Sequence, residues 1–316
     1  MAEPLAPLPT AGRDRRPLLG YAMVWTAATL FAVNGTVSKV VLSSGISSVE
    51  LTEVRSTGAF AGFVLVLLAT APERLRIQLR DLPFLVVFGV TGVAFVQWLY
   101  FVSIHRLPIG IALLIEYVAP LLVALFARFL LKEPVRRRIW VALALALVGL
   151  ALVVEVWSGG LALDELGLAA ALAAAGAYAA YILLAERGVA RRDPVSLSAY
   201  GFGFAALFWL AVRPLWRFPA GRLDDSVSLL GRLEHSELPV WLLMLFVVVV
   251  GTMATFGLVV AALRHLSATR VGIVAMLEPV VASLVAWAWL GESLSTVQLL
   301  GGCVVLTGIV LAQTAR

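Results

Sequence analysis

The chain contains 316 residues, of which 61% are hydrophobic and only 14% carry a charge, and its mean hydropathy is +0.99. Because soluble domains are about a quarter charged, this composition excludes a water-soluble globule and indicates a protein that lies in a membrane. One cysteine excludes an intramolecular disulfide and a multi-thiolate metal site, and we expect no cofactor and no bound metal. The net charge of +5 suits the basic loops that orient membrane proteins better than it suits nucleic acid binding.

Uncharged, apolar segments follow one another along most of the chain. A helix that crosses the hydrocarbon layer needs ~20 such residues. Continuous runs exclude an outer-membrane barrel, whose strands alternate apolar and polar residues. The sequence therefore predicts an all-α polytopic membrane protein with ten transmembrane helices. In chain order we expect these helices at 18–40, 47–71, 82–104, 109–131, 137–157, 165–186, 194–213, 238–263, 269–291 and 295–315.

Two longer segments lie outside the predicted helices. Residues 1–17 are rich in proline and carry three arginines, so we expect a disordered basic N-terminal tail. Residues 214–237 form the long connection in the second half, which we expect to be a loop. The first predicted helix is longer than the apolar core of a signal peptide, and we therefore expect it to remain in the protein.

The basic residues predict how the helices are oriented. With both termini in the cytoplasm, sixteen of the 24 lysines and arginines lie on the cytoplasmic side and six on the outer side, while Arg55 and Arg128 fall within helices. The positive-inside rule favours this arrangement. Three of the six outer residues lie within residues 214–237 and a fourth, Arg213, directly precedes them, so this connection is the weakest part of the assignment. We expect a multi-pass protein of the cytoplasmic (inner) membrane with both termini cytoplasmic.

The second half of the chain repeats a pattern of the first half at an offset of 159 residues (279 minus 120). Because each half holds five predicted helices, an odd number, the second half enters the membrane from the opposite side. Inverted repeats of this kind are typical of secondary transporters, whose substrate site lies near mid-membrane between the halves. The matching residues include Pro120, Glu133 and Gly149, which recur as Pro279, Glu292 and Gly308.

Two segments resemble a known family. Residues 116–133, EYVAPLLVALFARFLLKE, and residues 277–292, LEPVVASLVAWAWLGE, are each followed by an apolar helix with a late glycine. They resemble the paired domains of EamA-type carriers, which belong to the drug/metabolite transporter superfamily. The resemblance implies two EamA-like five-helix repeats, at 18–157 and 165–315, with cytoplasmic termini. It also implies efflux of small metabolites such as amino acids.

The chain departs from this family at two positions. Ala119 occupies the first-half position that pairs with Glu278. The small four-helix multidrug relatives carry a proton-binding glutamate in their first helix, whereas the first helix here offers only Asn34.

Two glutamates within predicted helices are the main candidates for substrate binding or ion coupling. A charged side chain at a helix centre costs ~2.5–3.5 kcal/mol on insertion scales, so such residues face the protein interior or a watery space. Glu116 lies seven residues from the outer end of its helix, roughly 10 Å deep at 1.5 Å per residue. It is a candidate site for a proton or a substrate ammonium group, and a structural carboxylate is the alternative. For Glu278, beside Pro279, the alternative is a role in positioning the helix.

Other polar and aromatic residues within the helices are candidates for lining a substrate site. Arg55 is expected to form an ion pair with a neighbouring helix or to contact an anionic substrate. Asn34 and Gln97 are expected either to bond between helices or to line the site. Tyr178 and Tyr181 share one helical face, where they can stack on a ligand or pack on small residues.

Pro120 and Pro279 are candidates for hinges. Each lacks a backbone N–H and is expected to kink its helix. A symmetry-related pair of kinks suits a gate, and a fixed bend without motion is the alternative.

These features together predict a secondary carrier that exports a small polar metabolite such as an amino acid, in exchange for protons at Glu116. An importer or facilitator of the same fold is the alternative. The sequence lacks a phosphate-binding Gly-Lys loop, which argues against ATP-driven transport, and it lacks the paired membrane aspartates of an intramembrane hydrolase, so we expect no enzyme. The expected partners are a small-molecule substrate, membrane lipid and protons, without nucleic acid. A homodimer is one alternative for the oligomeric state.

Overall fold

A computed structural model describes residues 16–104, 106–107, 109–132, 134–157 and 164–314 of the chain. Regular secondary structure in these residues is helical, apart from one short antiparallel pair of strands. The expected basic tail, except its last two residues, and Glu133 of the first repeat lie outside the described residues.

The first half of the chain forms α-helices joined by short 3₁₀ and π-helical segments. In chain order these are α1 (Pro17–Ser43), α2 (Ser48–Thr70), η1 (Pro72–Leu75), η2 (Leu79–Asp81), α3 (Leu82–Val87), η3 (Phe88–Ala94), α4 (Phe95–Ile104), α5 (Ile109–Glu116), α6 (Ala119–Phe129) and α7 (Arg137–Val153).

The second half repeats this alternation and adds the two strands. In chain order the elements are α8 (Glu165–Arg191), α9 (Pro194–Val212), η4 (Leu215–Arg217), η5 (Ala220–Asp224), β1 (Ser226–Ser228), η6 (Gly231–Leu233), β2 (Glu237–Pro239), α10 (Val240–Val248), η7 (Val249–Ala254), α11 (Thr255–Ala262), α12 (Ala268–Ala275), α13 (Leu277–Val285), η8 (Ala286–Leu290) and α14 (Thr296–Thr314).

Nine helices in the described part of the chain are long and apolar enough to cross a membrane. The helix expected at 137–157 is α7, which has 17 residues and is not among the nine. It ends at Val153, earlier than expected, because Glu155 adopts a left-handed backbone conformation with φ 46°, which terminates an α-helix.

The long connection between α9 and α10 is more ordered than the loop expected at 214–237. It contains 3₁₀ turns and the β1–β2 hairpin, in which Val227 pairs with Leu238. Val227 is buried in a cluster with Ile46 from the α1–α2 turn and Leu51 from the first turn of α2. Burial of these apolar side chains fixes the connection against the end of the helix bundle.

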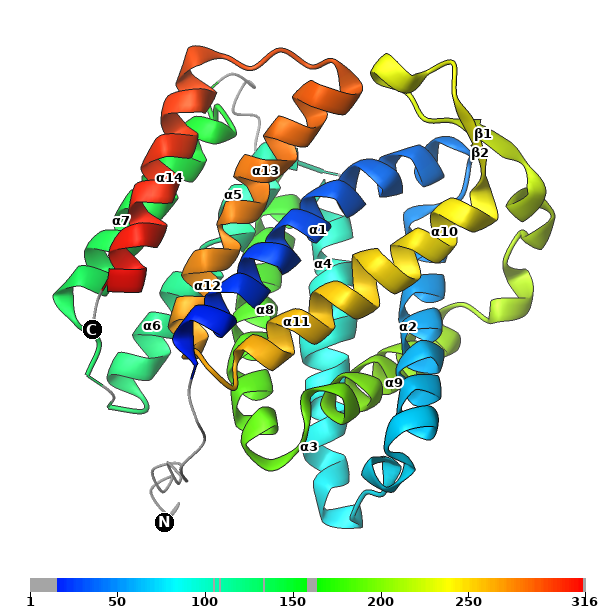
Figure 1. Ribbon diagram of the computed structural model, residues 1–316, viewed down its shortest axis with the longest axis horizontal. Helices are drawn as coiled ribbons and strands as arrows, with labels where there is room; N and C mark the ends of the chain where they lie inside the picture. The colour runs from blue at the N-terminus through cyan, green and yellow to red at the C-terminus, as the bar shows by residue number, and fades with distance from the viewer. Residues whose placement is uncertain (1–15, 105, 108, 133, 158–163, 315–316) are drawn as a thin grey trace.

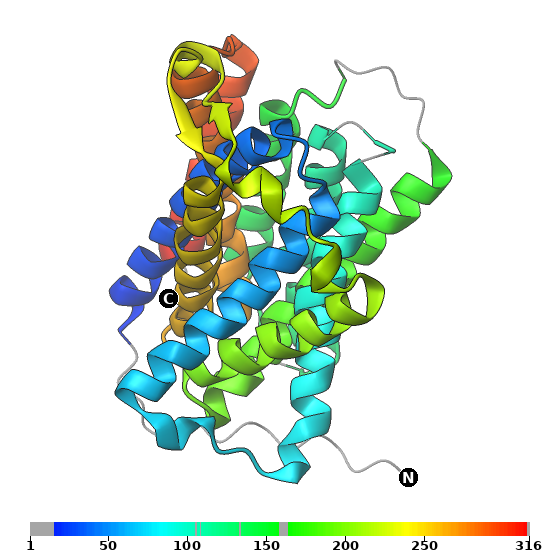
Figure 2. The same cartoon turned by 90° about the vertical axis from the view of Figure 1, so that its right-hand side faces the viewer.

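The helix bundle has two ends that differ in composition. We call the end that carries β1 and β2 the hairpin end, and the opposite end, where η1, η2 and the α8–α9 turn lie, the arginine end (Figure 1 and Figure 2). Arginines of the arginine end include Arg74, Arg76, Arg80, Arg191 and Arg192.

The two halves of the chain pack against each other along the bundle. α1 contacts α11 and α13, α2 contacts α9, α4 contacts α8, and α7 contacts α14. Figure 1 shows α7 and α14 side by side at one edge of the bundle. The principal helix pairs therefore join the first half to the second.

Local sequence signals set where two of these helices begin. In a capping box at the start of α2, the backbone N–H of Glu50 donates to Ser47 Oγ at 3.3 Å and that of Ser47 donates to Glu50 Oε2 at 2.6 Å. At the start of α9, Asp193 accepts from the backbone N–H of Ser196 at 3.0 Å, and Pro194 follows as the first helical residue. These caps fix Glu50 at the hairpin end and Asp193 at the arginine end.

Two membrane helices are interrupted along their length. The first break, at Tyr117 and Val118, separates α5 from α6, and the second, at Met276, separates α12 from α13. Pro120 and Pro279 lie in the first turn that follows each break. Proline removes a backbone donor and clashes with the preceding turn, which accounts for an interruption at this point in both halves.

π-helical segments also recur in both halves, and the corresponding segments η3 and η7 each contain a glycine. A Cβ atom on Gly92 in η3 would lie 3.2 Å from the Cα atom of Tyr181 in α8, and one on Gly251 in η7 would lie 1.8 Å from Asn34 Oδ1 in α1. The missing side chains therefore allow α8 and α1 to approach the π-helical segments closely.

α7 and α14 approach each other through glycines. A Cβ atom on Gly149 would lie 2.8 Å from the carbonyl oxygen of Gly301, and one on Gly308 would lie 2.8 Å from that of Ala142. The two contacts are reciprocal, since Gly301 and Gly308 each follow their first-half counterparts, Ala142 and Gly149, by 159 residues (301 minus 142, 308 minus 149). Backbone-to-backbone packing of this kind requires small residues.

Candidate functional site

Two carboxylates lie at the breaks of the interrupted helices. Glu116 is the last residue of α5, and Glu278 is the second residue of α13. The hydroxyl of Tyr117, in the first break, donates to Glu278 Oε2 at 2.8 Å. Glu116 lies close enough to Glu278 for their charges to interact, and both side chains are half-buried. The fold therefore brings together two glutamates that are 162 residues apart in the sequence (278 minus 116).

Arg55 of α2 lies near this pair but bonds elsewhere. Its Nε donates to Thr252 Oγ1 of η7 at 3.1 Å, while its charge lies within electrostatic range of Glu278. The expected ion pair with a neighbouring helix is therefore wrong as a direct contact, because no carboxylate among the described residues lies within 4.0 Å of Arg55. A hydroxyl of the π-helical segment holds the guanidinium instead.

Two further tyrosines lie near the two carboxylates. Tyr100 of α4 and Tyr178 of α8 both lie within electrostatic range of Glu116 and Glu278, and both are half-buried. We call this set the junction cluster, and its members are Arg55, Tyr100, Glu116, Tyr117, Tyr178 and Glu278.

Tyr181 differs from its neighbour Tyr178. The two rings are stacked with centroids 6.3 Å apart, and Tyr181 also stacks on Phe88 at 5.5 Å. Only 2% of Tyr181 is exposed. Its ring therefore belongs to the aromatic packing of the core, whereas Tyr178 lies at the edge of that packing beside the carboxylates.

Asn34 and Gln97 are buried, with 4% and 8% of their surface exposed. Asn34 Oδ1 and both amide atoms of Gln97 have no hydrogen-bond partner among the described residues. The bond between helices that the sequence suggests for these side chains is therefore absent from this part of the chain. Asn34 packs against Gly251 of η7.

Tyr100, Tyr117 and Thr252 are members or partners of the cluster that the sequence did not predict. Tyr117 directly follows Glu116 and precedes Pro120, so its place in a proline break was an available signal. Tyr100 and Thr252 come from other helices, and only the folded arrangement brings them to Arg55, Glu116 and Glu278.

Charged contacts close the hairpin end. Arg213 Nη2 donates to Glu50 Oε1 at 2.6 Å and joins the end of α9 to the start of α2. Arg222 donates to the carbonyl oxygen of Gly45 in the α1–α2 turn. Glu53, one turn after Glu50, is fully buried, and its carboxylate oxygens have no partner among the described residues. We call the contacts of Arg213 and Arg222 the hairpin-end clasp.

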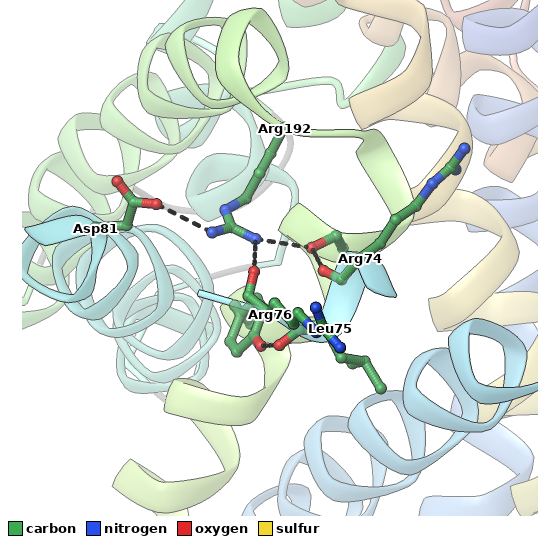
Figure 3. Close-up of polar contacts among 7 residues, drawn as sticks. Arg74, Leu75, Arg76, Asp81 and Arg192 are labelled. Carbon is green, nitrogen blue, oxygen red and sulfur yellow. Dashed lines mark hydrogen bonds and ion pairs between the residues drawn. The ribbon is translucent and has the colours of Figure 1, made fainter. Parts of the chain in front are cut away.

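A second set of contacts closes the arginine end (Figure 3). Three successive backbone carbonyls, at residues 74–76, accept hydrogen bonds from Ser196, Tyr200 and Arg192, respectively. Arg192 Nη2 also forms an ion pair with Asp81 Oδ2 at 3.0 Å. We call these contacts the arginine-end clasp, which ties the η1 segment of the first half to the α8–α9 turn of the second.

The described residues contain no group of three or more histidine, cysteine, aspartate or glutamate side chains that could hold a metal ion. The junction cluster offers the chemistry of its own side chains. It combines two carboxylates, one guanidinium and several phenol groups, which can bind a polar ligand and exchange a proton.

The chain is similar to several known proteins. The EamA-like transporter family matches residues 18–155 and 165–314. The threonine/homoserine exporter RhtA of Escherichia coli (strain K12) is 30% identical over 256 residues, which cover 81% of this chain and 79% of that protein. An uncharacterized transporter of Archaeoglobus fulgidus is 28% identical over 295 residues, 93% of this chain and 96% of that protein. A crystal structure of another protein, 20% identical, has the same fold with a TM-score of 0.74 and covers 93% of this chain and 96% of that chain.

These similarities confirm the resemblance seen in the sequence. The family matches both halves of the chain, and the relatives are transporters rather than enzymes. The apolar helices of the chain make it a multi-pass membrane protein. The chain belongs to the EamA-like transporter family.

Proposed function

We propose that this transporter is a secondary carrier that exports a small polar metabolite, first of all an amino acid, in exchange for protons. The observation that carries the proposal is the junction cluster, which holds Glu116 and Glu278 near Arg55 at the breaks of two membrane helices. An amino acid presents an ammonium group that a carboxylate binds and a carboxylate that a guanidinium binds. The name of the relative RhtA makes threonine and homoserine the first substrates to test.

A thermal-shift screen tests this proposal. Purified protein is heated with threonine, homoserine and a panel of other metabolites, and the substrate is expected to raise the Tm because a ligand at 100 times its Kd stabilises by ~2.7 kcal/mol. Arg55→Gln should remove the shift given by the amino acid. The proposal of an amino acid as substrate would be refuted by a metabolite that lacks a carboxylate and raises the Tm of the unmodified protein and of Arg55→Gln equally.

The alternative is an importer or a facilitator of the same fold. Proteoliposomes that hold the protein separate these cases. A proton-coupled exporter accumulates substrate against its gradient when the pH gradient drives proton exchange, whereas a facilitator only equilibrates it. Orientation of the protein in the vesicles then decides between export and import.

The architecture proposed for this function is ten membrane helices in two inverted five-helix repeats, at 18–157 and 165–315. Three observations support it: the paired helix breaks, the paired π-helical segments and the reciprocal glycine contacts between α7 and α14. In this arrangement the short helix α7 is the fifth membrane span, and α14 is its counterpart. The two repeats supply two gates to one site, as alternating access requires.

We propose that the arginine end faces the cytoplasm, as the positive-inside rule favours. The test uses single cysteines at two exposed positions, Ser226→Cys at the hairpin end and Arg137→Cys at the arginine end, in a Cys303→Ser background. An impermeant thiol reagent on intact cells is expected to label the first and spare the second. Permeabilised cells, in which both label, are the control. The reverse pattern on intact cells would invert the orientation.

We propose Pro120 and Pro279 as hinges, since both follow helix breaks next to the junction cluster. Pro279→Ala restores a backbone donor and is expected to straighten the helix. Substrate binding should persist while the rate of substrate counterflow falls. If counterflow keeps its rate and only the Tm changes, the break is a fixed bend.

A further inference from the structure

Two adjoining cavities lie at the arginine end, where membrane helices meet their connections. The first has a volume of about 300 Å³ and lies between the η1–η2 segment, the start of α3 and the α8–α9 turn. Its lining includes two aspartates, Asp81 and Asp193, and five arginines. Five positive and two negative charges give this basic cavity a formal net charge of +3. The arginines are Arg74, Arg76, Arg80, Arg191 and Arg192.

Only part of this positive charge is compensated. Arg192 pairs with Asp81 at 3.0 Å, and Arg74 lies 3.9 Å from Asp193. The other three arginines that line the basic cavity have no ion pair with a carboxylate in the described ranges. The basic cavity therefore attracts an anion, and guanidinium groups bind phosphate oxygens well.

The second cavity has a volume of about 520 Å³ and is an apolar groove. It runs between the first turn of α9 and the η7–α11 segment, both of which belong to membrane spans. Apart from Arg74, Asp193 and Arg264, its lining is uncharged and includes the partly accessible Val195, Met253, Leu258 and Ala261, together with Gly257. A groove of this kind suits an extended hydrocarbon chain rather than a polar molecule.

The basic cavity and the apolar groove share Arg74 and Asp193, whose ion pair lies where they meet. A ligand that fills both must carry a negative group at one end and a hydrocarbon chain at the other. We propose that this joint site binds an anionic phospholipid, with its phosphate on the arginines and an acyl chain along the groove on α9 and α11. Basic pockets at the membrane boundary are known to bind anionic headgroups in this way.

Such a lipid would contact both halves of the chain, since η1 belongs to the first half and α9 and α11 belong to the second. It would lie next to the arginine-end clasp, whose Arg192 and Asp81 line the basic cavity, and the lining of the two cavities includes no member of the junction cluster. The site is therefore a lipid site in addition to the substrate site, and it does not depend on which metabolite the protein carries.

Lipid binding to delipidated, purified protein in detergent tests the proposal, with native mass spectrometry and the Tm as readouts. The probes are phosphatidylglycerol, phosphatidylcholine with the same acyl chains, and inorganic phosphate. Phosphatidylglycerol is expected to bind and raise the Tm, while the other two do neither. Arg76→Gln combined with Arg80→Gln is expected to weaken that binding about thirtyfold. Each basic residue near an anionic headgroup contributes about five- to sixfold to the affinity, and two are removed.

Matched variants separate this site from general surface charge. Arg137→Gln combined with Arg138→Gln removes two exposed arginines that do not line either cavity, and it should leave the affinity unchanged. Gly257→Leu fills the groove and should weaken phosphatidylglycerol binding without removing a charge.

Three results would overturn the proposal. Equal binding of phosphatidylcholine would show that the arginines do not select the lipid. Binding of inorganic phosphate as tight as that of the lipid would indicate a soluble anion. An equal loss in the Arg137 and Arg138 variant would show that surface charge, rather than the joint site, attracts the lipid.

Discussion

Glu116→Gln is expected to abolish substrate accumulation driven by a pH gradient in proteoliposomes, while substrate counterflow continues in part. A carboxyl group takes up a proton and releases it when a substrate ammonium group binds at the same place, which couples the two movements. Glutamine keeps the size and the hydrogen-bonding capacity of the side chain but cannot titrate. Flux of labelled substrate into vesicles, with and without the pH gradient, measures both activities.

Glu278→Gln is the matched control, because it removes the other carboxylate of the junction cluster. Glu278 accepts a hydrogen bond from Tyr117 and lies near Arg55, so its charge has partners in the resting protein. We expect a weaker effect on coupling than for Glu116→Gln. Normal accumulation with a normal pH dependence in Glu116→Gln would make Glu116 a structural residue.

Gly149→Ala is expected to destabilise the protein by roughly 1–3 kcal/mol, the usual range for overpacking a tight interface. The added methyl group would lie 2.6 Å from the backbone nitrogen of Val305 and 2.8 Å from the carbonyl oxygen of Gly301. Backbone atoms cannot rotate away, so α7 and α14 must separate. The midpoint of thermal unfolding in detergent measures the loss.

Gly176→Ala provides the control for this change, since among the described residues no atom beyond the adjacent turns of its own helix would lie within 4 Å of a Cβ at Gly176. It should leave stability unchanged or raise it slightly, because alanine is the better helix former. Gly308→Ala meets the reciprocal contact and should cost about as much as Gly149→Ala. The double variant should lose less than the sum, since both act on one interface. A stable Gly149→Ala protein would mean that the helices tolerate a wider spacing.

Most of the helices could be predicted from the sequence because apolar runs of the required length are strong signals in a membrane protein. The prolines predicted kinks at residues 120 and 279, and the structure has a helix break two to three residues before each, since the loss of a backbone donor acts locally. The ordered connection between α9 and α10 could not be predicted in this way. Its hairpin is held by burial of Val227 against the α1–α2 turn, a contact between residues far apart in the chain.

The candidate site was predicted only in part, because its contacts also join residues that are far apart in the chain. The cost of burying charge identified Glu116, Glu278 and Arg55 as residues in need of partners, but not which partners they have. Tyr117 donates a hydrogen bond to Glu278, and Thr252 accepts one from Arg55, each from another segment of the chain. Tyr181 could not be told from Tyr178 by helical periodicity, because the packing of Phe88 decides which of the two rings is buried.

The two clasps have a consequence for the covalent chain itself. At both ends of the bundle, arginines of the second half hold backbone carbonyls of the first, and the principal helix pairs cross between the halves. The two halves are therefore held together by non-covalent contacts of the kind that join separate subunits. Residues 1–157 and 164–316, produced as separate chains in the same cell, should assemble and co-purify through a tag on either one. A failure to co-purify would show that the peptide link is needed for the halves to meet.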